Sequence, residues 1–143
     1  MRDDELLKVV FDTNVYISSF ITRQGRAEQA WKLAVERKIE AYTSAAILTE
    51  MAQKLREKFF WDDEKIKSAV RHIGKGTRIV KPNRKLSILV DEPDNRILEC
   101  AQYAGAEFIV TGDRHLLHMN AFSGIKIISI ADFLRVIEGT DLP

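Results

Sequence analysis

Several carboxylates in this sequence stand where strands should end or helices should begin, and they are the residues best placed to do chemistry. Asp12 comes directly after the apolar run VVF, and Asp113 follows the run EFIV with two residues between. A carboxylate at the end of a buried strand loses part of its hydration, and several together repel one another unless a cation compensates. The pattern therefore predicts a cation site, with candidate ligands Asp12, Glu50, Asp91, Asp94 and Asp113.

All of these side chains are oxygen donors, and no cluster of cysteine and histidine accompanies them. Hard oxygen ligands favour Mg²⁺ or Mn²⁺ over zinc. The single cysteine, Cys100, excludes an internal disulfide and a cysteine zinc site, and its apolar neighbours predict a small buried side chain rather than a nucleophile. This cysteine usage leads us to expect an intracellular protein.

Each acid also has an ordinary structural explanation. Glu50 lies one helical turn before Lys54, an order that gives a helical ion pair worth roughly a few tenths of a kcal/mol. Asp94 would be a favourable acid in the first turn of a helix, and Asp113 could serve only as an N-cap. Asp12 is the hardest to explain in this way, because few structural tasks require a charge immediately after Val-Val-Phe.

Expected strands and helices alternate along almost the whole chain, which predicts an α/β domain with a parallel sheet and helices on both faces. The expected strands are Lys8–Phe11, Ile39–Tyr42, Thr77–Val80, Glu107–Val110 and Ile125–Ile128. The expected helices are Thr13–Ile21, Ala27–Arg37, one from the cap Ser44 to about Lys58, one capped by Asp62, one from about Pro93 to Gly105, a short one through Leu116, and Ile130–Ile137 after the cap Ser129. Ligands bind such sheets at the carboxyl ends of the strands, so Asp12 and Asp113 should meet at one edge.

The length and composition indicate one ordinary globular domain. The 143 residues fit a single domain, 1–143, with a core from about residue 8 to residue 138 and with Gly74 and Gly76 in local loops. A net charge of +1 gives no strong attraction to nucleic acid or to a membrane surface, so RNA binding would need a local patch. The sequence has no long apolar run and no signal-peptide pattern, and we expect a cytoplasmic protein without membrane association.

Four segments occur in an order and spacing that resembles the PIN-domain family: VVFDTNV, ILTEM, DEPDNRILECA and IVTGDRHLL. The resemblance runs from about Lys8 to Glu138 and is strongest to bacterial and archaeal toxins of toxin–antitoxin systems. It implies a three-layer α/β/α sandwich with a central, mainly parallel sheet. It also implies a metal-dependent ribonuclease, in particular an endoribonuclease, that hydrolyses RNA phosphodiester bonds through a metal-activated water with Mg²⁺ or Mn²⁺ as cofactor.

The resemblance also assigns residues. The family's catalytic and metal-binding acids correspond to Asp12, Glu50, Asp94 and Asp113, with Asp91 as an auxiliary acid, and the polar positions that support these acids correspond to Asn14 and Thr111. Many members carry a further aspartate where this chain has His115, which leaves open whether one or two ions bind. Contacts to RNA phosphates are expected from residues next to the motifs, namely Arg96, Arg114, His115 and Lys54.

The resemblance further implies an antitoxin protein as partner and a homodimer. Two other classes with an acid after an apolar strand fit poorly. A haloacid-dehalogenase phosphatase needs a second acid where Asn14 stands, and a receiver domain needs a lysine at a late strand end, where this chain has Thr111-Gly112-Asp113. The alternative that remains is a PIN-like module that binds RNA or protein without cleaving.

Overall fold

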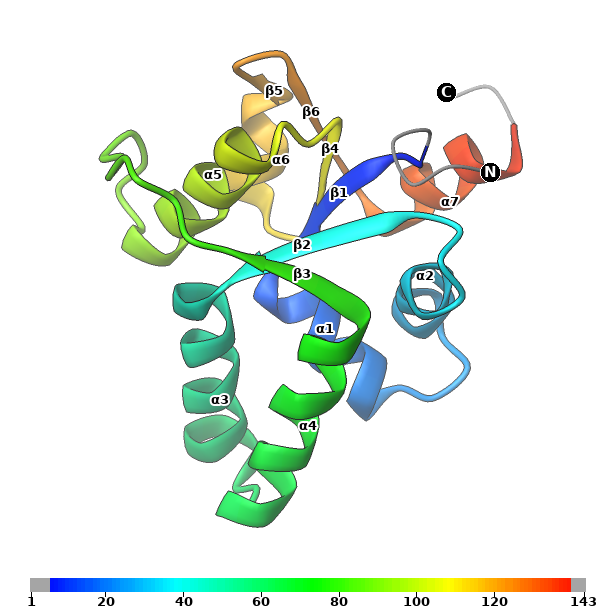
Figure 1. Ribbon diagram of the computed structural model, residues 1–143, viewed down its shortest axis with the longest axis vertical. Coiled ribbons are helices and arrows are strands. Elements are labelled where there is room, and N and C mark those ends of the chain that lie inside the picture. Colours follow the sequence, from blue (N-terminus) through cyan, green and yellow to red (C-terminus); the bar gives the residue numbers. More distant parts are fainter. Residues whose placement is uncertain (1–5, 140–143) are drawn as a thin grey trace.

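The protein was analysed as a computed structural model, which describes residues 6–139 and shows a central six-stranded sheet (Figure 1). The strands are β1 (Lys8–Phe11), β2 (Glu40–Ser44), β3 (Thr77–Val80), β4 (Phe108–Val110), β5 (Ala121–Phe122) and β6 (Ile125–Ile128). Their order in the sheet is β3-β2-β1-β4-β6-β5, and every pair is parallel except β5 with β6. The predicted, mainly parallel sheet is confirmed.

Seven helices in the described part of the chain connect and cover these strands. They are α1 (Thr13–Ile21), α2 (Arg26–Val35), α3 (Ala45–Phe59), α4 (Asp63–Gly76), α5 (Glu92–Ala104), α6 (Arg114–Met119) and α7 (Ile130–Glu138). Figure 1 shows α3 and α4 on one side of strands β2 and β3 and α5 on the other. The arrangement is the α/β/α sandwich that the sequence indicated. No helix among residues 6–139 is long and apolar enough to cross a membrane.

The strand order reverses between β1 and β4. From β1 the chain moves outward through β2 to β3, then returns to the other side of β1 with β4 and continues to β6. Residues Val10 and Phe11 of β1 lie beside Ile109 and Val110 of β4. The backbone N–H of Asp12 donates to the carbonyl of Val110 at 3.0 Å, so the ends of these two strands are held together. This point is where ligands bind in doubly wound sheets.

The buried centre explains why β1 reads as a continuous apolar run. Val9, Val10 and Phe11 are all 0% exposed, as expected for a parallel strand covered on both faces. The ring of Phe11 meets those of Tyr16 and Phe133 edge to face, with centroids 5.7 and 6.0 Å apart. Helices from the two ends of the chain therefore pack on the strand that carries Asp12.

The predicted caps place the helices accurately. The side chains of Ser44, Asp62 and Ser129 each accept a backbone N–H from the first turn of α3, α4 and α7. Gly105 ends α5 with φ of 67°, in the left-handed region that glycine adopts without strain. These local signals are what fixed the predicted boundaries to within one or two residues.

Two features differ from the sequence prediction. Gly74 and Gly76 do not lie in loops but in the last turns of α4. A Cβ at Gly76 would come within 2.5 Å of Cη2 of Trp31, so the glycine lets the buried indole lie against the helix backbone. The sequence analysis also missed β5, which has two residues and exists through its antiparallel pairing with β6.

Candidate active site

Asp12 and Asp113 meet at the switch point through one threonine. The hydroxyl of Thr111 donates to Oδ2 of Asp12 at 2.6 Å, and the backbone N–H of Asp113 donates to the same hydroxyl oxygen at 2.9 Å. Thr111 is 0% exposed and Asp12 is 5% exposed, so this connection is inside the protein. It orients the Asp12 carboxylate, which is the supporting role that the resemblance assigns to Thr111.

Asp113 also caps a helix. Its Oδ1 accepts the backbone N–H groups of His115 and Leu116, at 2.8 and 3.1 Å, at the start of α6. The structural explanation considered for this residue is therefore correct, and it does not compete with the chemical one. The cap fixes the carboxylate in the direction of its neighbours, and both bonds use a single oxygen.

Glu50 reaches the same region from α3. Its Oε2 accepts the hydroxyl of Thr13 at 3.3 Å, and its Oε1 pairs with Nζ of Lys54 at 3.1 Å. The ammonium of Lys54 also donates to Oδ1 of Asn14 at 3.3 Å. The Glu50–Lys54 ion pair that the sequence suggested is present. The contact of Lys54 with Asn14 links this pair to the start of α1, the helix that follows Asp12.

Asp94 lies among the other acids. It is 6% exposed, and its Oδ2 is buried without a hydrogen-bond partner. The pKa of Asp94 is raised to about 7, first by burial and then by the charges of Asp113, Asp91, Asp12 and Glu50, in that order of importance. Carboxylates from four separate segments of the chain therefore act on one side chain.

The pKa of Asp12 is raised for similar reasons. Burial raises the pKa of its carboxyl above the ordinary value, and the charge of Glu50 adds to this. The hydrogen bond from Thr111 and the charge of Lys54 oppose the rise. A folded chain rarely gathers poorly solvated acids without a functional reason, so these shifted pKa values mark a candidate site.

The donor set fits a hard divalent cation. All the acids offer oxygen, and the unpartnered buried oxygen of Asp94 is a group that a cation would satisfy. Within residues 6–139, however, no three acidic, histidine or cysteine side chains lie close enough to share one ion. The site is therefore not a closed protein cage. Mg²⁺ is commonly held by one or two carboxylates together with water and substrate phosphates, which suits this looser arrangement.

Three predicted polar residues lie beside the acids in different ways. Asn14 is exposed and touches Lys54 rather than a carboxylate, so its side chain supports Glu50 through the ammonium. Arg114 and His115 are exposed on the first turn of α6, next to Asp113. They are in a position to meet a ligand that approaches the acids.

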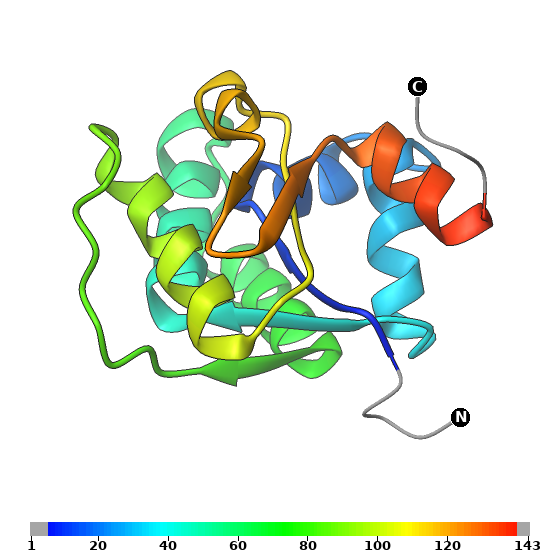
Figure 2. The same ribbon diagram turned by 90° about the horizontal axis from the view of Figure 1, so that it is seen from above.

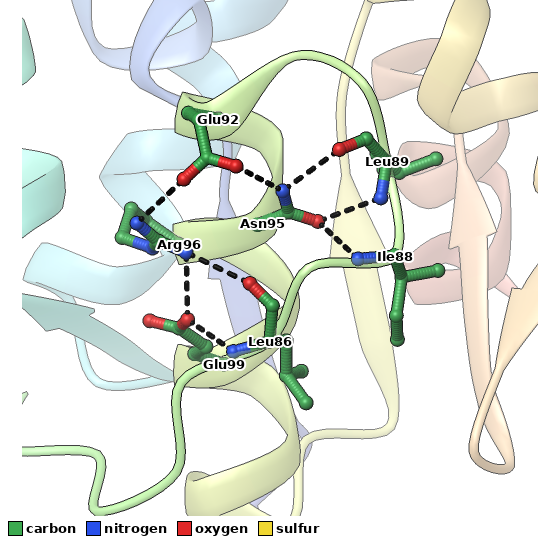
Figure 3. A network of polar contacts seen from close by, with 7 residues as sticks. All are labelled: Leu86, Ile88, Leu89, Glu92, Asn95, Arg96 and Glu99. Atoms are coloured by element: carbon green, nitrogen blue, oxygen red, sulfur yellow. Dashed lines mark hydrogen bonds and ion pairs between the residues drawn. The ribbon is translucent and has the colours of Figure 1, made fainter.

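Arg96, which we expected to contact RNA, is committed elsewhere. Its guanidinium pairs with Glu92 at 3.2 Å and Glu99 at 2.9 Å and donates to the carbonyl of Leu86 at 2.9 Å (Figure 3). These contacts fix the connection between β3 and α5 against the helix, and Figure 2 shows this connection running along the outside of the molecule. The expected phosphate contact is therefore replaced by a structural role, because the partners of Arg96 come from its own helix and the preceding loop.

Asn95 completes this attachment. Its Oδ1 accepts the backbone N–H groups of Ile88 and Leu89 at 3.1 and 2.8 Å, and its Nδ2 donates to the carbonyl of Leu89 at 2.9 Å and to Glu92 at 3.3 Å (Figure 3). The side chain is 0% exposed. One amide thus satisfies the backbone of Ile88 and Leu89, two consecutive loop residues immediately before Val90.

Replacing Asn95 with alanine should lower the free energy of unfolding by about 2–3 kcal/mol, because three backbone polar groups lose their partner. The amides of Ile88 and Leu89 should exchange with deuterium faster than in the wild type. Urea unfolding and hydrogen exchange measure these effects. Asn83→Ala, at an exposed position of the same connection, is the control and should change neither quantity. Unchanged exchange in Asn95→Ala would show that the loop is held by other contacts.

The sequence analysis missed a group of residues next to the acids. Leu89, Val90, His118 and Met119 line a pocket together with Asp91 and Asp94. The sequence did carry a signal for one of them, since His115 and His118 are three residues apart and share a face of α6. Nothing in the sequence indicated that α6 and the loop before α5 line the same pocket.

Comparisons with known proteins give matches in sequence and in fold. The family model described as "PIN domain" matches residues 8–115. An uncharacterized protein of Methanocaldococcus jannaschii, MJ1680, is 34% identical over 118 residues, which cover 79% of this chain and 75% of that protein.

Among solved structures, the chain is similar to one described as "Crystal structure of VapBC2 from Rickettsia felis bound to a DNA fragment from their promoter". The TM-score is 0.65 at 12% identity, over 86% of this chain and 98% of the other. It is also similar to PAE2754 from Pyrobaculum aerophilum, with a TM-score of 0.61 at 13% identity, over 94% and 99% of the two chains. At these identities the likeness shows the fold. Together with the family match over more than half of its length, it shows that this chain belongs to the PIN-domain family, whose members are generally nucleases.

Proposed function

We propose that this protein is a metal-dependent endoribonuclease that uses Mg²⁺ or Mn²⁺. The observation that carries the proposal is the position of Asp94, whose buried and unpartnered oxygen is surrounded by the charges of Asp113, Asp91, Asp12 and Glu50. Without a cation this arrangement is unfavourable, and a folded protein keeps such a cost mainly at functional sites.

The proposed metal-binding acids are Asp12, Asp94 and Asp113, of which one or two would bind an ion directly and the others through water, with Glu50 binding directly or through water and Asp91 as an auxiliary acid. When bound, the ion would lower the pKa of a water molecule and offset negative charge on the scissile phosphate. The chain's own residues prepare the site for this. Thr111 holds Asp12 in one orientation, and the capping bonds hold Asp113. Lys54 holds Glu50 at the edge of the site.

The substrate contacts that we propose come from α6 and α3. Arg114 and His115 are exposed next to Asp113 and can meet a phosphate. The side chain of Lys54 is 24% exposed and lies beside Glu50. It can therefore meet a phosphate only where the RNA strand passes the carboxylates. These side chains are the ones that we propose for the local RNA contacts that a chain with a net charge of +1 requires.

The proposal includes a biological setting. The similar structure from Rickettsia felis is that of VapBC2 bound to promoter DNA. By analogy we propose that this chain is the toxin of a toxin–antitoxin pair, acts in the cytoplasm and forms a homodimer. Co-expression with a neighbouring small gene and mass measurement of the purified complex test the partner and the stoichiometry.

The decisive test of the activity is cleavage of a mixed set of labelled single-stranded RNAs. We expect internal cleavage with Mg²⁺ or Mn²⁺, none with EDTA, and none with Asp113→Asn. The matched control is Asp63→Asn, which removes a charge of the same kind from an exposed position on α4. Equal cleavage by wild type and Asp113→Asn would identify a contaminating nuclease. Absence of cleavage by the pure wild type with either ion would favour the non-cleaving RNA- or protein-binding module.

Replacing Lys54 with methionine tests whether its ammonium faces the cation site. The metal-free variant should be less stable by about 1 kcal/mol, because a partly buried ion pair is lost. Added Mn²⁺ should raise its melting temperature more than that of the wild type, since the ion no longer competes with Lys54 for Glu50. Thermal unfolding with and without Mn²⁺ measures both. Lys32→Met, which breaks the exposed pair with Glu36, should show the wild-type response to the ion. A wild-type response in Lys54→Met would place the ammonium outside the site.

A further inference from the structure

A second feature adjoins the acidic site and shares Asp91 and Asp94 with it. Asp91 and Asp94 form one end of a pocket of about 1020 Å³. Its apolar wall comes from Leu89 and Val90 in the loop before α5 and from Met119 at the end of α6. The remaining lining comes from the basic and imidazole side chains of α6, namely Arg114, His115 and His118.

One side chain of the apolar wall, Val90, is exposed where a structural role would bury it. The side chain of Val90 is fully exposed, and the neighbouring Ile88 is 49% exposed. Loops usually display polar residues, and large apolar groups in water beside a functional site commonly mark a binding surface. Leu89 and Met119 are partly buried and pack against the core, so the exposure of Val90 is the feature of this wall that indicates a binding surface.

The wall is also held in a fixed position. Asn95 binds the backbone of Ile88 and Leu89, and Arg96 binds the carbonyl of Leu86, so the residues just before Val90 are attached to α5 (Figure 3). A site built on fixed backbone loses less entropy when a ligand binds. Val90 is therefore exposed on a loop that is held in place by hydrogen bonds to α5.

We propose that this pocket holds one unpaired nucleobase of the RNA strand whose phosphate lies at the acids. The inference rests on the proposed nuclease function and adds the part of the substrate that is recognised. A base has flat apolar faces, which Val90 and Met119 can cover, and polar edges, which His118 can meet. Imidazole and guanidinium planes are groups on which unpaired bases stack. Because Asp94 belongs to both features, a nucleotide whose base fills the pocket has its phosphate near the carboxylates.

The proposal determines the form of the substrate. A base in a duplex is stacked on both faces and paired at its edge, so it would have to leave the helix to enter between the loop and α6. The enzyme should therefore cleave single strands, loops or bulges and leave a perfect duplex of the same sequence intact. A peptide segment is the other kind of occupant that an apolar pocket could accept, and the experiment below separates the two.

The test uses one single-stranded RNA that the wild type cleaves, in versions that each lack the base at one position. With Mn²⁺, loss of the base at one position next to the cleaved bond should reduce kcat/KM about tenfold, whereas its loss at distant positions should have little effect. This measurement needs no protein variant, so it does not depend on whether a variant folds.

Protein variants give the reciprocal measurement. Val90→Ser and His118→Ala should each raise KM about three- to tenfold on intact RNA, with kcat nearly unchanged. They should also be less sensitive than the wild type to loss of the base at the critical position. Val35→Ser is the control, because Val35 is a half-exposed valine on α2. Its kinetics should match the wild type.

The outcomes are distinct. If the wild type cleaves RNA but no single base matters and both variants have wild-type kinetics, the base pocket is wrong while the nuclease function stands. If the variants keep wild-type RNA kinetics but lose binding to a co-expressed protein, the occupant is a peptide and the proposal is again overturned. If the wild type cleaves no RNA with Mg²⁺ or Mn²⁺, the nuclease function fails and the pocket proposal fails with it.

Discussion

Replacing Asp12 with asparagine should abolish metal-dependent RNA cleavage and at the same time stabilise the metal-free protein. The loss of activity should be at least about 10³-fold, or about 4 kcal/mol, because a ligand of the ion is removed at the strand end that organises the site. The gain in stability follows from the raised pKa of Asp12, since burial disfavours its charged form. An uncharged amide of the same shape avoids that cost and can still accept the hydroxyl of Thr111.

Two measurements on the same sample check this prediction. Cleavage of labelled RNA gives the activity, and urea unfolding in EDTA at pH 8 gives the free energy of unfolding, which should rise by about 1 kcal/mol. Asp63→Asn is the control for loss of a charge outside the site, and it should leave cleavage unchanged. An Asp12→Asn protein that is inactive and also less stable would show that the residue is needed for the fold, and its inactivity would then say nothing about metal binding.

The layout of the fold could be predicted because most of its signals are local. Ser44, Asp62 and Ser129 cap helices through bonds to backbone within three residues, and β1 is apolar throughout because it is buried on both faces. Such features depend on the residue itself and its near neighbours. The features that were mispredicted depend on distant partners. Glycine is required at position 76 of α4 because a side chain there would meet the indole of Trp31, and β5 exists through its pairing with β6.

The same distinction between local signals and distant partners applies to the candidate site. Parallel strands end at one edge, so the sequence could predict that Asp12 and Asp113 would meet. The sequence could not show by itself that Thr111, which only the resemblance marked as a supporting residue, joins them, because Asp12 and Thr111 are 99 residues apart in the chain. Nor could it show that Arg96 is taken up by Glu99 and the Leu86 carbonyl, since a surface arginine next to a motif looks the same in either role.

The site also shows how function opposes stability in this chain. Thr111 and Lys54 lower the pKa of Asp12, yet burial and Glu50 raise it, and the net shift is upward. Thr111 and Lys54 therefore offset only part of the destabilisation of the charged Asp12 by burial and by Glu50. That residual repulsion provides free energy that a divalent cation can gain on binding, so the affinity for metal and the instability of the metal-free protein have one cause.

The strongest consequence concerns pH. In metal-free buffer, stability should fall as the pH rises from about 4 to about 7, because the pKa of Asp94 is raised to about 7 from its ordinary 3.8. In this range the folded protein holds a proton that the unfolded chain has released, so each step toward higher pH favours unfolding. After allowance for screening by water, the contribution of Asp94 should be about 2–4 kcal/mol. Asp12 acts in the same direction. Glu28 and Asp63 have pKa values lowered by hydrogen bonds and act in the opposite direction.

Asp94→Asn isolates this effect, because its amide is neutral at every pH. The stability of wild type minus variant, from urea unfolding in EDTA, should decline between pH 5 and pH 8. Millimolar Mg²⁺ should reverse the decline in the wild type, since the ion binds the deprotonated carboxylates, and should have little effect on Asp94→Asn. Cleavage should rise with pH over the same range. A difference that is flat with pH would show that Asp94 is well solvated when ionised. If the slope appears but Mg²⁺ does not reverse it, the acids repel one another without forming a cation site, and the proposed function loses its main support.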